Sequence, residues 1–183
     1  FPSLREVLSI GSLSSVKCLS ADSFLSLSQD LFGLVQTYGV RMMVQYIGGC
    51  HCGNIDVSFE TELAPGDFNP RACQCSFCRK HFTRALSDPS GRIDIIVHRN
   101  ADLSRYQFGV KATEFLICKS CGVYVSAYMP DGASAYANVM ANVLDNHQSF
   151  RDGVITDYGD EDEAGKRARR REKWTPAKLS VVG

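Results

Sequence analysis

Apolar and polar residues alternate in short runs through the central part of the chain. Five runs follow this pattern: 55–59, 93–97, 113–117, 123–128 and 135–139. Turn sequences separate several of them, namely Pro65-Gly66, Pro89-Ser90-Gly91 and Pro130-Asp131-Gly132. Successive side chains of a strand point to opposite faces of a sheet, and these runs are rich in β-branched and aromatic residues. The pattern therefore predicts a mainly β domain.

The two ends of the chain differ from this centre. Residues 1–43 are rich in Ser and Leu and carry no motif tied to chemistry, so we expect a poorly structured N-terminal extension. At the other end, an acidic stretch at 157–163 precedes a basic stretch at 166–173, which favours a solvated or helical tail over part of a core. We therefore predict one domain at 44–160, followed by a charged C-terminal tail at 161–183.

Length and charge exclude several classes of protein. With 183 residues, 44% of them hydrophobic, the chain can build a core without disulfide bonds. Twenty Lys and Arg balance twenty Asp and Glu, so no net field attracts nucleic acid or anionic lipid. The basic run at 166–173 lacks interleaved aromatic residues, and no run of about 20 apolar residues is present. We expect neither a nucleic-acid partner nor a membrane span.

Seven of the eight cysteines fall into three tight groups. These groups are Cys50-His51-Cys52, Cys73-Gln74-Cys75-Ser76-Phe77-Cys78 and Cys118-Lys119-Ser120-Cys121. Because no secretory leader is recognisable in this sequence, such spacings predict metal ligands kept reduced, as in the cytoplasm. The eighth cysteine, Cys18, stands alone outside the predicted domain.

The two paired groups suit one closed site. One residue separates Cys50 from Cys52, a spacing that places both side chains on one face of a strand. Two residues separate Cys118 from Cys121, as in the tight turns of many structural zinc sites. Glycine follows the second cysteine of each pair, which lets the backbone bend around an ion. Together the four thiolates predict a tetrahedral site.

The remaining group supplies three thiolates within six residues: Cys73, Cys75 and Cys78. Three protein ligands leave a fourth position for water or substrate, which distinguishes catalytic from structural zinc. Sulfur ligands favour zinc over magnesium, calcium or manganese, and a separate group of three is less consistent with an iron-sulfur centre. We predict two Zn²⁺ per chain. Two alternatives stay open: Cys50 and Cys52 share an ion with Cys73 and Cys75, or both sites are structural.

Three motifs in the same order resemble those of the glutathione-dependent formaldehyde-activating enzyme family, whose domain is shared with centromere protein V. The motifs are Tyr46-Ile47-Gly48-Gly49-Cys50-His51-Cys52-Gly53, Cys73-Gln74-Cys75-Ser76-Phe77-Cys78-Arg79-Lys80 and Cys118-Lys119-Ser120-Cys121-Gly122. The resemblance runs from about 46 to about 160 and implies an Mss4-like (β-tent) zinc-binding domain. It implies structural zinc on Cys50, Cys52, Cys118 and Cys121, and catalytic zinc on Cys73, Cys75 and Cys78.

One position departs from the family pattern. Gln74 stands where the family often has His, and a glutamine cannot carry a proton at neutral pH. An acid-base role at this position is therefore not expected. The cations Arg79, Lys80 and Arg84, which follow the second motif, are candidates to attract a substrate carboxylate.

The resemblance implies a carbon-sulfur lyase-type enzyme that acts on a small thiol or thiol adduct. The family's reaction joins glutathione to formaldehyde as S-(hydroxymethyl)glutathione, so glutathione is the implied substrate. The alternative is a non-catalytic, zinc-stabilised β module that binds a protein partner, because a fold does not determine a function. The second metal site distinguishes them: an open position facing a pocket favours the enzyme, and a fourth protein ligand favours the module.

Overall fold

The computed structural model of the chain describes residues 42–183. The expected N-terminal extension, except for Met42 and Met43, lies outside the described residues. Cys18 also lies outside them. Residues 42–183 form one unit.

Most of the described residues that have regular structure are in strands, which confirms the prediction of a mainly β domain. The strands are β1 (Val44–Gly49), β2 (Ile55–Thr61), β3 (Arg71–Cys73), β4 (Ala85–Leu86), β5 (Arg92–Val97), β6 (Leu103–Tyr106), β7 (Glu114–Cys118), β8 (Tyr124–Asp131), β9 (Ser134–Met140), β10 (Val154–Thr156) and β11 (Thr175–Val181). Two α-helices, α2 (Ser76–Lys80) and α3 (Glu163–Lys173), accompany them. Short 3-10 helices lie in the connections: η1 (Pro65–Asp67), η2 (Asn100–Asp102), η3 (Ala141–Val143) and η4 (His147–Ser149).

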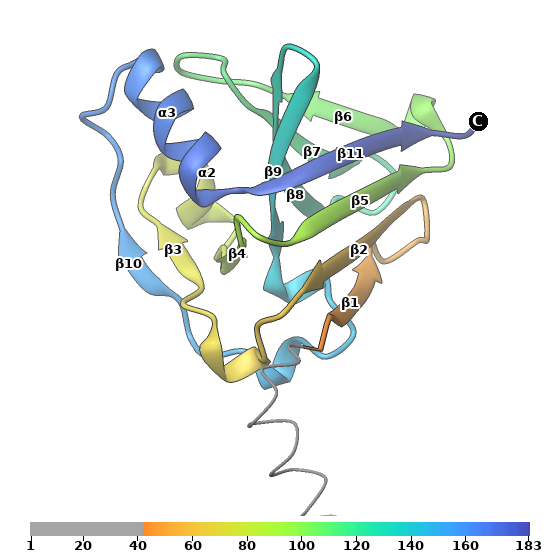
Figure 1. Cartoon of the computed structure of the whole chain (residues 1–183). Helices are drawn as coiled ribbons and strands as arrows, with labels where there is room; N and C mark the ends of the chain where they lie inside the picture. Colours follow the sequence, from red (N-terminus) through yellow and green to blue (C-terminus); the bar gives the residue numbers. More distant parts are fainter. Residues whose placement is uncertain (1–41) are drawn as a thin grey trace, which may run out of the picture. The chain divides into compact units, whose positions relative to one another are not determined.

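Strand β11 joins two parts of the sheet (Figure 1). Residues 177–181 of β11 pair in parallel with β5, next to the antiparallel strands β2 and β1. Residues 175–176 of the same strand pair with β9 instead. Strand β9 leads on one side to the meander β8, β7 and β6, and also to the short strands β4, β3 and β10. The last strand therefore connects elements from both halves of the domain.

Buried side chains from alternate positions of the strands fill the space between these two parts of the sheet. In β2, Ile55, Val57 and Phe59 are buried while the residues between them are more exposed. Their partners in β5 alternate in the same register, so that Val57 lies opposite the buried Ile95. A one-residue shift of register would turn the apolar set toward solvent, and the buried face therefore determines the pairing.

Each of the five predicted runs overlaps a strand, namely β2, β5, β7, β8 and β9. Six other strands were not predicted from the sequence. Of these, β3, β4 and β10 contain only two or three residues, too few for a period of two to be recognised. Their pairing depends on neighbours that are distant in the sequence.

The segment predicted as a charged tail, 161–183, is part of the domain. Helix α3 begins after Asp162, whose side chain accepts a hydrogen bond of 2.7 Å from the backbone of Gly165. Arg171 fixes the helix to the β8–β9 turn by a bidentate contact with Asp131, at 2.6 and 2.8 Å. Strand β11 then enters the sheet, and Thr175 is fully buried. The charges of this segment are used for contacts within the domain and toward a cavity, which its composition alone does not reveal.

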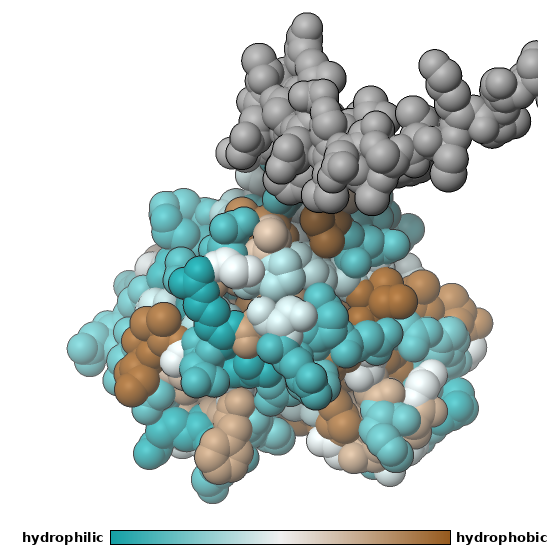
Figure 2. Space-filling view, turned by 90° about the horizontal axis from the view of Figure 1, so that it is seen from below, coloured by the Kyte–Doolittle hydropathy of each residue, from teal (hydrophilic) through white to brown (hydrophobic). Residues whose placement is uncertain are grey.

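The surface of the described domain is mixed in character. Figure 2 shows one face on which hydrophilic residues predominate and hydrophobic residues form separate patches. Among the residues drawn in colour, this face offers no single broad apolar surface. Neither described helix has the length and apolar character needed to cross a membrane.

Candidate metal centres

The first cysteine pair lies on a turn, not on a strand as its spacing suggested. Strand β1 ends at Gly49, and the chain reverses at once: the amide of Cys50 donates to the carbonyl of Ile55 at 2.8 Å. The amide of Gly53 donates back to the carbonyl of Cys50 at 3.1 Å. Gly53 has a φ of +72°, which side chains rarely tolerate, so glycine is required for the turn.

The second pair follows β7 on the tight turn that its spacing predicted. Cys118 is the last residue of β7, and the amide of Gly122 donates to its carbonyl at 2.8 Å. Gly122 has a φ of +75°. The glycine after each cysteine pair therefore has a left-handed conformation, which lets the backbone bend there as expected from the sequence.

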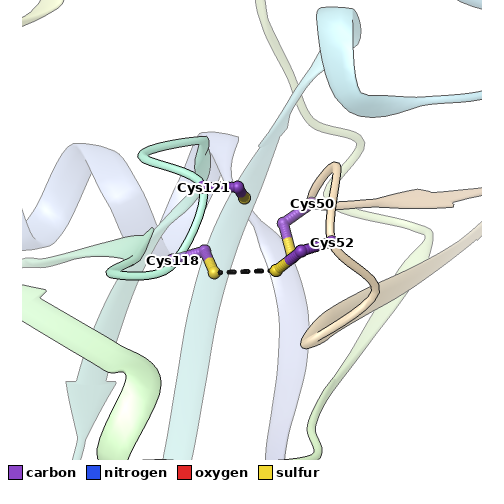
Figure 3. A group of neighbouring side chains, drawn as sticks. All are labelled: Cys50, Cys52, Cys118 and Cys121. Atoms are coloured by element: carbon purple, nitrogen blue, oxygen red, sulfur yellow. Dashed lines mark hydrogen bonds between the residues drawn. The ribbon is translucent and has the colours of Figure 1, made fainter.

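The four side chains of these two turns converge on one point (Figure 3). Their Sγ atoms all lie within 4.8 Å of one another, with 3.7 Å between Cys50 and Cys52 and 3.4 Å between Cys52 and Cys118. Sulfur atoms bound to zinc at about 2.3 Å in a tetrahedron lie roughly 3.8 Å apart, so the donor set fits this ion. Cys118 is fully buried and Cys50 nearly so.

The third group forms a separate cluster. Cys73 ends β3, Cys75 is the N-cap of α2, and Cys78 lies in the first turn of that helix. Their Sγ atoms also lie within 4.8 Å of one another. The alternative in which Cys50 and Cys52 share an ion with members of this group does not fit, because the two pairs belong to different clusters. Among the described residues, no fourth His, Cys, Asp or Glu completes the group of three.

The three thiols of this cluster differ in acidity. Hydrogen bonds from Cys73 and Cys78 lower the pKa of the Cys75 thiol to about 2. Hydrogen bonds within the cluster, together with burial, raise the pKa of the Cys73 and Cys78 thiols. A divalent cation at this cluster would replace the shared protons and relieve the repulsion of three adjacent sulfurs. The chemistry of this donor set also fits zinc.

A cavity of about 470 Å³ opens beside the group of three. Its wall contains Cys73, Cys75 and Cys78, and apolar side chains such as Phe115 and Trp174 line much of the rest. The volume lies within the range of about 300–1,000 Å³ that small-molecule sites occupy. The cluster of three cysteines therefore faces a space in which a small ligand fits.

The model of the glutathione-dependent formaldehyde-activating enzyme (GFA) family matches residues 45–158. The chain belongs to this family. The matched segment includes all seven clustered cysteines and ends before α3 and β11.

One similar solved structure is that of a Rhodobacter sphaeroides protein, with 30% sequence identity and a TM-score of 0.41. The match covers 54% of this chain and 87% of that one. A search of curated proteins gave no match.

The cations that the sequence analysis singled out beside the GFA motif do not line the cavity. Arg79 and Lys80 are exposed. Arg84 donates hydrogen bonds to Asn142 Oδ1, at 3.0 Å, and to backbone carbonyls that include that of Phe150, at 3.1 Å. Its role is to hold the segment after β9 in place. The expectation that these three residues attract a substrate carboxylate is therefore not supported.

Other cations do line the cavity, and the sequence analysis did not connect them with the site: Arg71, Lys166, Arg169 and Arg170. Arg71 lies two residues before Cys73 on β3, so the period of two could have placed both on one face. The other three belong to α3, beyond the segment that the GFA model matches. No local pattern indicated that this helix packs beside the cysteines.

Gln74, the departure from the family pattern, also lies away from the cavity. Its side chain donates a hydrogen bond of 2.9 Å to the carbonyl of Ala72. The residue does not line the cavity. This placement agrees with the expectation that position 74 has no acid-base role.

Proposed function

We propose that this GFA protein is a zinc-dependent carbon-sulfur lyase-type enzyme that acts on a small thiol adduct. The model reaction is the union of glutathione and formaldehyde to S-(hydroxymethyl)glutathione. Structural zinc would be held by Cys50, Cys52, Cys118 and Cys121, and catalytic zinc by Cys73, Cys75 and Cys78. One observation carries the proposal: the three-cysteine cluster faces a ligand-sized cavity, and no fourth described residue completes it.

The reaction needs no oxidant or reductant. The thiol sulfur adds to the aldehyde carbon, a carbon-sulfur bond forms, and the thiol proton is transferred to the former carbonyl oxygen. The reverse direction breaks the same bond. Zinc with an open position, when bound, would favour the thiolate form of a thiol and polarise a carbonyl oxygen.

Tyr124 is the residue of this chain best suited to assist at the oxygen. It is buried in the wall of the cavity. Burial, and then the charge on Cys78 and its neighbours, raise the pKa of the Tyr124 phenol well above its usual value. The phenol therefore keeps its proton at neutral pH and can donate a hydrogen bond to an oxygen that becomes negative.

Two-dimensional exchange NMR tests this function directly. Formaldehyde and glutathione are mixed with the zinc-loaded full chain, and the rate of exchange between free and hydroxymethylated glutathione is measured. We expect a rate that rises in proportion to the protein concentration. The series is repeated with other small thiols to identify the substrate. An exchange rate that the protein leaves unchanged for every thiol would exclude the lyase and favour the module that binds a protein partner.

A further inference from the structure

The cavity contains an unusual concentration of unsatisfied polar groups. Among the described residues, six buried side-chain nitrogen or oxygen atoms have no hydrogen-bond partner. Five of them belong to residues that line this cavity: Arg71 Nη2, Arg170 Nε and Nη1, Thr83 Oγ1 and Thr113 Oγ1. Buried polar groups are nearly always paired in native proteins, and a cluster of exceptions needs a specific reason. A ligand that accepts hydrogen bonds would supply one.

The other charged side chains of the cavity already have partners. Arg169 donates to both carboxylate oxygens of Glu161, at 2.8 and 3.0 Å, and also stacks on the ring of Tyr158. Asp157 accepts a hydrogen bond of 2.9 Å from the backbone of Gly159. The ammonium group of Lys166 donates to the backbone carbonyl of Glu161. Among the described cations of the cavity, only Arg71 and Arg170 have buried side-chain nitrogens without a hydrogen-bond partner.

The guanidinium group of Arg170 lies over an aromatic ring. Its guanidinium carbon lies 5.0 Å from the ring centroid of the buried Trp174, one turn further along the chain. Burial and the neighbouring charge of Arg169 lower the pKa of Arg170 to about 10, so the group is still charged at pH 7. A charged group that is desolvated and unpaired costs stability, which a bound anion would restore.

Arg71 and Arg170 are also close enough to the cysteine cluster to serve the same ligand. Both arginines line the same cavity as the three cysteines, and Arg71 lies two positions before Cys73 on β3. Phe115 and Trp174 provide apolar walls in the same cavity. The arrangement suits an elongated molecule with sulfur at one end, an apolar middle and an anion at the other end.

We propose that Arg71 and Arg170 form a carboxylate-binding subsite, so that this enzyme selects thiols that carry a carboxylate. The inference rests on the proposed function for the thiol end of the ligand. Guanidinium groups bind carboxylates by paired hydrogen bonds, and the hydroxyl groups of Thr83 and Thr113 add further donors in the same cavity. Helix α3, which the family model does not include, would thereby determine the choice of substrate.

The experiment compares two thiols of the same shape that differ in charge, N-acetylcysteine and N-acetylcysteine amide. Their binding to the zinc-loaded full chain is measured by calorimetry. We expect the acid to bind about tenfold or more tightly than the amide, because hydrogen bonds to an ionised acceptor are roughly twice as strong as those to a neutral one. In Arg170→Gln the preference should fall below about threefold, while the affinity for the amide stays the same. Arg170→Lys should retain part of the preference, because it keeps the charge but not the paired donors.

Lys173→Gln is the matched control, because it removes one positive charge from the same helix at an exposed position outside the cavity. It should keep the full preference. Arg71→Gln gives a second, independent variant on a different element if Arg170→Gln does not fold. The subsite is wrong if wild type binds acid and amide equally or binds neither, or if both arginine variants keep the preference.

The exchange NMR assay separates this proposal from the lyase proposal. A preference for the acid without any formation of adduct would leave the subsite in place and refute the lyase. Formation of adduct from acid and amide with equal efficiency would support the lyase and overturn the subsite.

Discussion

The sulfur atoms of Cys52 and Cys118 lie 3.4 Å apart, although 66 positions separate the two residues in the chain. Cys52 belongs to the turn after β1, and Cys118 ends β7. Strand β1 pairs within one part of the sheet and β7 within the other. An ion held by the four cysteines would therefore tie the two parts together.

Replacement of Cys118 should damage the fold. Binding energy at a structural zinc site is largely folding energy, so Cys118→Ser should lower the free energy of unfolding by about 5 kcal/mol or more. Thermal and urea denaturation of the zinc-loaded protein measure this change. Native mass spectrometry should find about two zinc ions in wild type and one fewer in the variant. A variant that melts at the wild-type temperature would contradict a structural role for this site.

Replacement of Cys75 should lower activity far more than stability. If the three-cysteine cluster is catalytic, Cys75→Ser should lower the rate of thiol exchange about 100-fold or more, because one ligand of the reactive ion is changed. The free energy of unfolding should change by less than about 2 kcal/mol, because the four-cysteine site is intact. Cys118→Ser is the comparison. Equal loss of stability in both variants, with no response of a cobalt-substituted protein to thiols, would make both sites structural.

Metal binding at the three-cysteine cluster should release protons. In the metal-free protein the pKa of Cys75 is lowered to about 2, so this thiol is already ionised at pH 7. The pKa values of Cys73 and Cys78 are raised, so both thiols keep their protons at pH 7 and must lose them when an ion binds. Affinity should therefore rise as pH rises, by about 100-fold per unit between pH 6 and 8.

Competition with a chelator, on protein whose four-cysteine site is already loaded, measures this slope. Calorimetry in two buffers with different ionisation enthalpies counts the protons independently. An affinity that does not vary with pH would show that the three thiols are ionised before the ion arrives.

Removal of residues 161–183 should prevent folding, contrary to the behaviour of a solvated tail. Strand β11 lies between β5 and β9, so its loss leaves the facing edges of both strands without partners. Trp174, which is buried, is lost as well. We expect the shortened chain to lose the cooperative unfolding transition of wild type in circular dichroism. A chain that lacks only Val182 and Gly183 is the control: these residues follow β11 and make single backbone hydrogen bonds with Val97 and Asn100, so the chain should keep a cooperative transition.

Local patterns were sufficient to predict several parts of this structure. The alternation at 55–59 and 93–97 predicted strands β2 and β5, because the burial of one face acts on every second residue. The spacing of Cys118 and Cys121, with Gly122 after them, predicted a tight turn, because backbone geometry over a few residues determines it. Features of this kind depend on neighbours in the sequence.

Which residues line the cavity depends on contacts between segments distant in the sequence, and no local pattern indicates such contacts. The basic run at 166–173 was predicted to belong to a solvated or helical tail because it is highly charged and has few apolar residues. It does form a helix, α3, but this helix places Arg170 in the wall of the cavity beside the cysteine cluster. This placement follows from the pairing of β11 with β5 and β9 and from the burial of Trp174. The sequence by itself determined that seven cysteines form three metal-ligand motifs and that the domain is mainly β, since spacing and alternation act over a few residues; how these motifs divide into a cluster of four and a cluster of three was decided by the tertiary structure. Only the tertiary structure decided which cations face the cysteines, because that depends on how strands distant in the sequence pair.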